Sequence, residues 1–165
     1  ILLTHVAMRL ILYYQDLILE SMQYNRIGIT FSTFDLFHAG HVKMLEEAKK
    51  QCDYLIVGLQ LDPSLERSDK NKPTQNVIER YIQLKGCKHI DEIIPYIMED
   101  DLIDILQSFK IDVRIIGEEY KYINFTGKDY CINNKIDIYY NKRKHRFSSS
   151  GLKKKILMDS YKSLK

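Results

Sequence analysis

The sequence predicts an α/β domain in which helices cover both faces of a five-stranded parallel sheet. Short apolar, β-branched runs alternate with amphipathic stretches along the 165 residues, a pattern typical of parallel sheets. The run DYLIVGLQ at 53–60 is almost continuously apolar, as expected for a strand buried on both faces. Because crossovers between parallel strands are right-handed, this alternation predicts a three-layer α/β/α sandwich.

Each element is predicted from local composition. The strands are expected at 26–32, 53–60, 90–95, 112–117 and 135–140. The helices are expected at 39–51, 76–85, 99–109 and 148–160, the last of them capped by serine. The polar stretch 61–75 contains two prolines and predicts a loop. Since ligands of such sheets bind beyond the carboxyl ends of the strands, the site is expected in the loops after residues 32, 60, 95, 117 and 140.

Residues 1–24 are expected to form an extension outside a domain that spans residues 25–165. Apolar side chains from Leu10 to Ile18 recur near helical spacing, which predicts an amphipathic helix. The alternative interpretation is an upstream stretch that is not native. Arg9 and Asp16 interrupt the segment and its start is not basic, so it fits neither a membrane span nor a signal peptide.

Charge and cysteine usage exclude some classes of protein. The net charge of +3 is too small to argue for a nucleic-acid partner. The three cysteines, Cys52, Cys87 and Cys131, form no C-x-x-C pair, which argues against a zinc site or a redox pair. Their odd number favours reduced thiols, so a cytoplasmic protein with no membrane partner is expected.

The loop after the first strand carries the strongest functional signal, TFDLFHAGH at 33–41. His38 and His41 are three residues apart at the start of a helix, so both can face one side. The helix N-terminus offers unpaired N–H groups and a positive dipole, and Gly40 lets an anion approach the backbone. Because phosphoryl transfer depends on positioning and charge stabilisation, paired imidazoles here predict a site for that chemistry.

The run TFDLFHAGHVKMLEEAKKQCDYLIVG at 33–58 resembles the cytidylyltransferase family of the nucleotidyltransferase superfamily. The resemblance continues through ERY, IDEIIP and GEEY, and ends at RKHRFSSS (143–150), where the family has RTEGISTT. It implies a Rossmann-like nucleotidyltransferase fold and transfer of CMP from CTP to a phosphorylated small alcohol. Glycerol 3-phosphate, phosphocholine and phosphoethanolamine are the acceptors of such enzymes. It also implies a homodimer, and Mg²⁺ held mainly by the nucleotide phosphates rather than by protein ligands.

The resemblance assigns roles to individual residues. Those with catalytic roles are His38, His41, Lys72 and Arg143, with the histidines stabilising the α-phosphate. Those that bind the nucleotide or its phosphates are Thr33, Phe34, Gly40, Lys70, Arg80, Ser148 and Ser149. Several alternatives stay open: Arg80 could pair with a carboxylate, Ser148 and Ser149 could be helix caps, and Asp35 is expected to fix the loop by hydrogen bonds. Lys153, Lys154 and Lys155 are expected to form a solvated face.

Departures from the family pattern leave the acceptor open. Ser32 replaces a glycine, and His145 and Arg146 replace an acid and a glycine. The acidic run 99–101 stands where glycerol-3-phosphate enzymes have basic contacts; it favours either a cationic head group or simply a helix N-terminus. The stretch 124–131 is longer than the family's loop and is expected to cover the acceptor. Two rival functions remain: an adenylyltransferase acting on a sugar phosphate, and a non-enzymatic nucleotide- or RNA-binding module.

Overall fold

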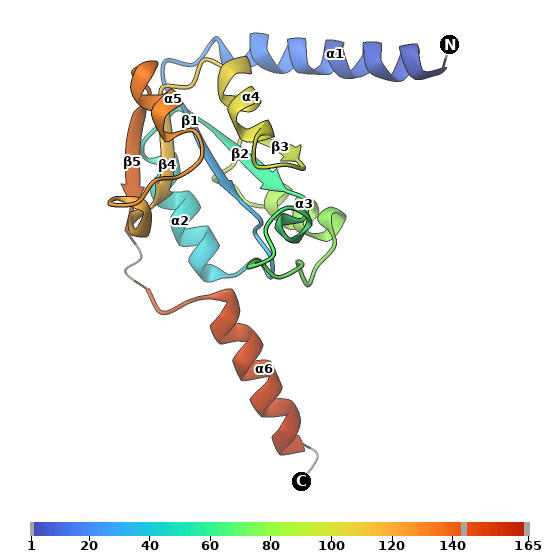
Figure 1. Cartoon of the computed structure of the whole chain (residues 1–165), viewed down its shortest axis with the longest axis vertical. Coiled ribbons are helices and arrows are strands. Elements are labelled where there is room, and N and C mark those ends of the chain that lie inside the picture. The colour runs from blue at the N-terminus through green and yellow to red at the C-terminus, as the bar shows by residue number, and fades with distance from the viewer. Residues whose placement is uncertain (1, 143–144, 164–165) are drawn as a thin grey trace.

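The computed structural model describes residues 2–142 and 145–163 and confirms the predicted sheet (Figure 1). All five strands are parallel, in the order β3-β2-β1-β4-β5. Their bounds are β1 (Ile27–Ser32), β2 (Tyr54–Gln60), β3 (Glu92–Tyr96), β4 (Val113–Gly117) and β5 (Asp137–Asn141). The predicted strands differ from these by one or two residues at their ends.

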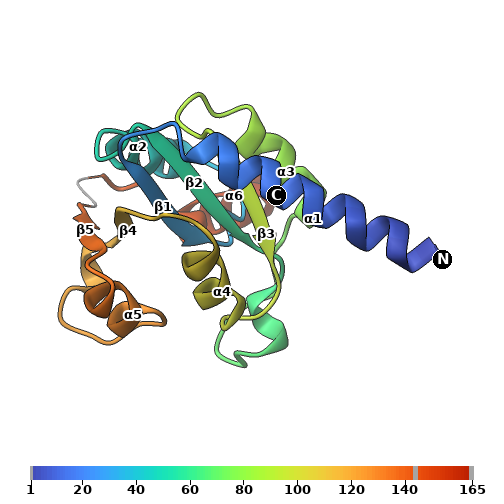
Figure 2. The same cartoon turned by 90° about the horizontal axis from the view of Figure 1, so that it is seen from above.

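Helices cover both faces of the sheet, so the three-layer prediction is also confirmed. Figure 2 shows α2 and α3 on one face and α4 and α5 on the other. The helices are α1 (Leu2–Ser21), α2 (Ala39–Lys49), α3 (Val77–Lys85), α4 (Asp101–Ser108), α5 (Lys128–Asn133) and α6 (Ser149–Ser163). Two short 3₁₀ turns, η1 (Pro63–Leu65) and η2 (Glu118–Tyr120), follow β2 and β4.

The alternation of side chains along the strands builds two hydrophobic cores. Ile29 and Ile56 contribute to a core with α4, whereas Leu55 and Val57 contribute to a core with α2 and α3. All seven residues of β2 are buried, because this strand has a neighbour on each side and helices above and below. Each fully buried aliphatic side chain stabilises the fold by about 1.5–3 kcal/mol.

One helix lies where the sequence predicted a loop. Residues 128–133 form α5, which starts after Gly127 and buries Cys131. Gly127 has φ +78°, a backbone conformation that favours glycine. The helix is only six residues long, too short for a periodic pattern to stand out in the sequence.

The N-terminal segment forms the predicted helix, α1, which projects from the sheet in Figure 1. Its last turns pack on the domain, where Leu17 is 4% exposed within the core. Nearer the N-terminus of the helix, Met8, Ile11 and Leu12 are exposed. Within the described parts of the chain, no helix combines the length and apolar character needed to cross a bilayer.

Candidate nucleotide-binding site

A cavity of about 520 Å³ opens at the carboxyl edge of the sheet, and we call it the central cavity. All five strands contribute to its lining, with Ser32, Gln60, Tyr96, Gly117 and Asn141 at or near their ends. The parallel topology places these strand ends together. The central cavity therefore lies where the sequence placed the ligand.

The two histidines of the motif lie together at the start of α2. The rings of His38 and His41 are stacked, with their centroids 4.0 Å apart and their planes 19° from parallel. The ring of Phe37 stacks on His41 at 5.5 Å. Neither histidine lines the central cavity itself, but Thr33, the first residue of the motif, and Met44, in the second turn of α2, both do. The pair therefore stands beside the cavity at a helix N-terminus, a place suited to an anion.

Main-chain hydrogen bonds determine which ring nitrogen carries the proton. His38 Nδ1 accepts from the Gly40 N–H at 2.9 Å, and His41 Nδ1 accepts from the His38 N–H at 3.3 Å. A neutral imidazole that accepts at Nδ1 must carry its proton on Nε2. Both rings therefore carry their proton on Nε2, and their planes are nearly parallel.

The sequence suggested that Gly40 leaves room for an anion, but in the structure Gly40 leaves room for two histidine rings. A Cβ at this position would lie 2.7 Å from His38 Cε1 and 2.9 Å from His145 Cε1. The space above Gly40 is thus filled by two imidazole rings rather than left open to an anion. His145, a departure from the family motif, thereby packs against the start of α2.

The remaining residues of the loop organise it rather than line the cavity. Phe34 is 1% exposed within a core, and its φ of +52° is unusual for a non-glycine residue. Its contribution to a nucleotide site is therefore limited to the main chain. Asp35 accepts hydrogen bonds from the Gln75 N–H at 2.9 Å and from Lys153 Nζ at 3.2 Å. Burial alone would raise the pKa of Asp35. Hydrogen bonds from the backbone N–H groups of Gln75 and Thr74 and from the Lys153 ammonium outweigh that effect, so the pKa of Asp35 lies below its ordinary value.

Arg80 holds strand ends together from within the core. Its side chain is 1% exposed, and its guanidinium donates to the carbonyl oxygens of Thr33, Gln60, Leu61 and Gln75. Among the described residues it forms no ion pair with a carboxylate, which was one alternative from the sequence, and it does not line the central cavity. In this structure its role is to fix the ends of β1 and β2 beside the cavity.

The other predicted site residues differ in whether they lie at the central cavity. Lys70 lines the central cavity and pairs with Asp69 at 3.5 Å, whereas Lys72 is exposed and outside the lining. Ser148 Oγ accepts from the Gly151 N–H and caps α6. Ser149 Oγ donates to the Asp35 carbonyl oxygen at 3.0 Å. Arg143 lies outside the described residues.

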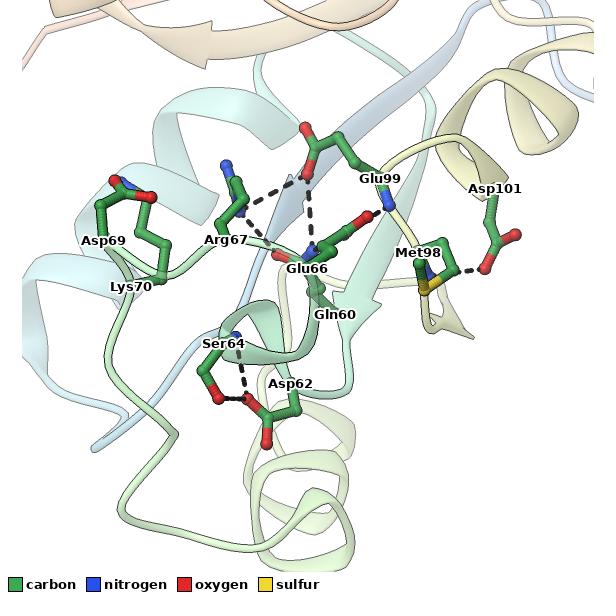
Figure 3. Close-up of polar contacts among 10 residues, drawn as sticks. All are labelled: Gln60, Asp62, Ser64, Glu66, Arg67, Asp69, Lys70, Met98, Glu99 and Asp101. Atoms are coloured by element: carbon green, nitrogen blue, oxygen red, sulfur yellow. Dashed lines mark hydrogen bonds and ion pairs between the residues drawn. The ribbon is translucent and has the colours of Figure 1, made fainter.

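A polar network forms one wall of the central cavity (Figure 3). Arg67 lies 3.5 Å from the Glu99 carboxylate and donates to Gln60 Oε1 at 3.2 Å. Gln60 Nε2 donates to Glu66 and Glu99, and Glu66 accepts from the Glu99 N–H. These contacts join the loop after β2 to the turn before α4. Asp101 instead accepts from the N–H groups of Ile97 and Met98, in the turn before α4.

Several residues at the site were not predicted from the sequence. Gln60 and Arg67 belong to no recognisable motif, and Lys153 was expected to be solvated. Arg114, by contrast, left a signal: a charged residue inside the apolar strand VRIIG. Its side chain is 3% exposed and lines the central cavity.

Comparison with known proteins identifies the family. Residues 29–155 match the cytidylyltransferase-like family model. A glycerol-3-phosphate cytidylyltransferase of Bacillus spizizenii is 35% identical over 127 residues, which cover 76% of this chain and 93% of that protein. An ethanolamine-phosphate cytidylyltransferase of Dictyostelium discoideum is 37% identical over 90 residues, 52% of this chain and 24% of that protein. The bifunctional protein HldE of Acidiphilium cryptum is 36% identical over 103 residues, 62% of this chain and 21% of that protein.

Solved structures share the fold. A lipopolysaccharide core biosynthesis protein from Thermoplasma volcanium superposes with a TM-score of 0.58 at 22% identity, over 71% of this chain and 94% of that one. The pantothenate synthetase of Thermus thermophilus gives a TM-score of 0.51 at 8% identity, over 72% of this chain and 55% of that one. These structural likenesses concern the fold alone. The family model and the Bacillus relative confirm the resemblance seen in the motif, and the chain belongs to the cytidylyltransferase-like family of nucleotidyltransferases.

Proposed function

We propose that this protein transfers CMP from CTP to a phosphorylated small alcohol and releases pyrophosphate. The observation that carries the proposal is the stacked His38–His41 pair, whose main-chain hydrogen bonds orient two Nε2–H donors at the start of α2. The likeness to a glycerol-3-phosphate cytidylyltransferase over 93% of that protein's length supports the choice of CTP and of this class of acceptor.

The reaction proceeds by direct displacement. A phosphate oxygen of the acceptor attacks the α-phosphorus of CTP, the bond from that phosphorus to the bridging oxygen breaks, and pyrophosphate leaves in line. The attacking oxygen is already anionic, so no protein group need remove a proton. The two imidazole N–H groups donate to the α-phosphate oxygens, where negative charge must be stabilised in the transition state. Preorganised orientation supplies much of the rest of the rate enhancement.

The same proposal includes Mg²⁺ bound through the triphosphate. Among the residues that the structure describes, no three His, Cys, Asp or Glu side chains gather as a metal site. The Asp35 carboxylate, within the motif, already accepts hydrogen bonds from the Gln75 N–H and Lys153 Nζ. When bound, Mg²⁺ would neutralise phosphate charge, with the phosphates and water as its ligands. Lys70, Lys72 and Arg143 remain the proposed phosphate contacts from the protein.

A cytoplasmic location and a homodimer complete the proposal, by analogy with the family. Light scattering coupled to gel filtration tests the assembly, and a dimer of the 19.6 kDa chain is the expected species. A monomer at micromolar concentration would contradict it.

The second candidate is adenylyl transfer from ATP to a sugar phosphate, which the matches to HldE favour. A pyrophosphate-release assay separates the two functions. Each of the four nucleoside triphosphates is tested against glycerol 3-phosphate, phosphocholine, phosphoethanolamine and a sugar phosphate. We expect CTP to exceed ATP by at least about tenfold in kcat/KM, a difference of about 1.4 kcal/mol in transition-state binding. Equal or greater turnover with ATP would favour the second candidate.

A further inference from the structure

Arg114 is a buried cation at the floor of the central cavity. It is the second residue of β4, paired in register with Ile29 of β1 and Ile138 of β5. Its side chain is 3% exposed, yet it lines the cavity. An arginine near the start of a buried strand has lost most of its water, so something else must stabilise its charge.

The residues around Arg114 satisfy only part of its guanidinium. The guanidinium carbon lies 5.3 Å from the ring centroid of Phe31 and 4.8 Å from that of Phe125. Nη1 donates to the Thr126 carbonyl oxygen, and the Cys131 thiol lies alongside. Nε is buried and, among the described residues, has no hydrogen-bond partner. Aromatic faces and one carbonyl therefore hold the group in place and leave the Nε–H donor unused.

No described carboxylate forms an ion pair with Arg114. The nearby acid Glu99 is already paired with Arg67 and hydrogen-bonded to Gln60. Burial lowers the pKa of Arg114, with Cys131, Glu99 and Tyr96 opposing it. Among the charged residues that line the central cavity, three are cations and two are carboxylates, namely Arg67, Lys70, Arg114, Glu99 and Glu119. The cavity floor therefore offers an excess positive charge at Arg114.

We propose that Arg114 binds an oxyanion of the acceptor, a carboxylate or a second phosphate, at the end remote from the reacting phosphate. The inference rests on the proposed function and narrows its acceptor to phosphorylated small molecules with a second anionic group. The flat guanidinium suits an oxyanion because its N–H groups lie in one plane and bond two oxygens at once. An ammonium head group would meet this buried cation at close range, so Arg114 disfavours choline and ethanolamine acceptors.

Binding measured without nucleotide tests the role of Arg114 independently of turnover. The probes for isothermal titration are 3-phosphoglycerate, which adds a carboxylate, glycerol 1,3-bisphosphate, which adds a phosphate, glycerol 3-phosphate and phosphocholine. We expect one of the two doubly anionic probes to bind the unmodified chain about 10- to 100-fold more tightly than glycerol 3-phosphate does, with phosphocholine weakest. Whichever binds more tightly distinguishes a carboxylate from a phosphate. Equal binding of all four probes would overturn the proposal without any variant.

Variants locate the preference. Arg114→Met keeps an unbranched side chain between Phe31 and Phe125, and we expect it to abolish the preference while glycerol 3-phosphate binding changes less than threefold. Arg114→Lys should retain part of the preference, because it keeps the charge but loses the fork of donors. The matched control is Arg26→Met, which removes an arginine that lies just before β1 and pairs with Asp137 at 2.7 Å. An unchanged preference in folded Arg114→Met would overturn the assignment.

Pyrophosphate release with CTP tests the proposed transferase function separately from the proposed role of Arg114. If the doubly anionic probes bind through Arg114 but no pyrophosphate appears with any nucleotide, the transferase proposal fails and the Arg114 site stands. If glycerol 3-phosphate or phosphocholine turns over with CTP as fast in Arg114→Met as in the unmodified chain, and faster than either doubly anionic probe, the transferase stands and Arg114 does not select its acceptor.

Discussion

The carboxylate of Asp35 accepts a hydrogen bond from Lys153 Nζ at 3.2 Å, although 118 residues separate them in the chain. Asp35 belongs to the loop that leads into the histidine pair, and Lys153 belongs to α6. Ser149 adds a second link by donating to the Asp35 carbonyl oxygen. The C-terminal helix α6 extends away from the sheet in Figure 1. Its first turns are thus hydrogen-bonded to the loop that contains Asp35.

Lys153→Met should loosen this attachment with little effect on global stability. The ion pair is partly exposed, with side-chain exposures of 41% for Lys153 and 13% for Asp35, so its loss should cost at most about 1 kcal/mol. We expect faster proteolysis between β5 and α6 and a lower kcat/KM. Lys154→Met is the matched control, since Lys154 is exposed. Identical cleavage rates in the two variants would show that the pair does not hold α6.

Asp35 also predicts a pH dependence. Because its pKa is lowered in the folded state, its contribution to stability is present above the ordinary carboxyl pKa of 3.8 and is lost as the pH falls through the lowered value. Urea denaturation of the unmodified chain and of Asp35→Asn, between roughly pH 6 and pH 2, measures this. We expect the difference in unfolding free energy between them to shrink as the pH falls. A difference independent of pH would mean that the charge of Asp35 is not involved.

His38→Asn separates the cap of α2 from the chemistry. Asparagine is a good N-cap that can still accept from the Gly40 N–H, but it lacks the Nε2–H donor. We expect near-unchanged thermal stability and a loss of kcat on the order of 10²–10³-fold, as for removal of a preorganised transition-state donor. His38→Ala should lose the same activity and also about 0.5–2 kcal/mol of stability. Near-normal turnover in folded His38→Asn would contradict the role of the pair; His89→Ala serves as the control.

Arg80→Met should destabilise the fold rather than act only on substrate binding. The substitution leaves four main-chain carbonyl oxygens without their buried donor, a loss of about 3 kcal/mol or more. Arg80→Lys should restore little, because an ammonium cannot reach all four positions. Urea denaturation provides the measurement. Unchanged stability with a raised KM for CTP would instead identify Arg80 as a phosphate ligand.

Cys52 should react slowly in the native protein. Burial raises the pKa of its thiol to about 11, so little thiolate exists at neutral pH. Its contribution to stability is present below the ordinary thiol pKa of 9.0 and is lost as the pH rises towards about 11. The alkylation rate of a variant that retains only Cys52 measures this. Rapid alkylation of this variant in its folded state at pH 7 would contradict the burial of the Cys52 thiol.

Removal of divalent cations tests the proposed Mg²⁺. Excess EDTA should abolish pyrophosphate release, and added Mg²⁺ should restore it. Without nucleotide, EDTA should leave the melting temperature unchanged, because the proposed ligands are phosphates rather than protein side chains. A melting temperature that falls with EDTA alone would indicate an ion bound by the protein.

The order of strands and helices could be predicted because it depends on local periodicity. An apolar run such as 54–60 predicts a buried strand, and the contiguous histidine motif indicates the family, without any knowledge of distant contacts. The sheet, its carboxyl edge and the family could therefore all be predicted from them. Helix α5 could not be predicted, because its six residues are too few to show a period and it depends on packing of Cys131.

The roles of individual polar residues were decided by tertiary structure. Arg80 and Arg114 are both buried arginines, yet Arg80 donates to four carbonyl oxygens, whereas Arg114 keeps a buried Nε with no partner among the described residues. Lys153 sits in a lysine run and still reaches Asp35. The sequence by itself predicted that a cavity would lie at the carboxyl edge of the sheet, where the structure has one. Only folding decided which side chains face it, because the partner of a buried donor is set by whichever distant loop the fold brings beside it.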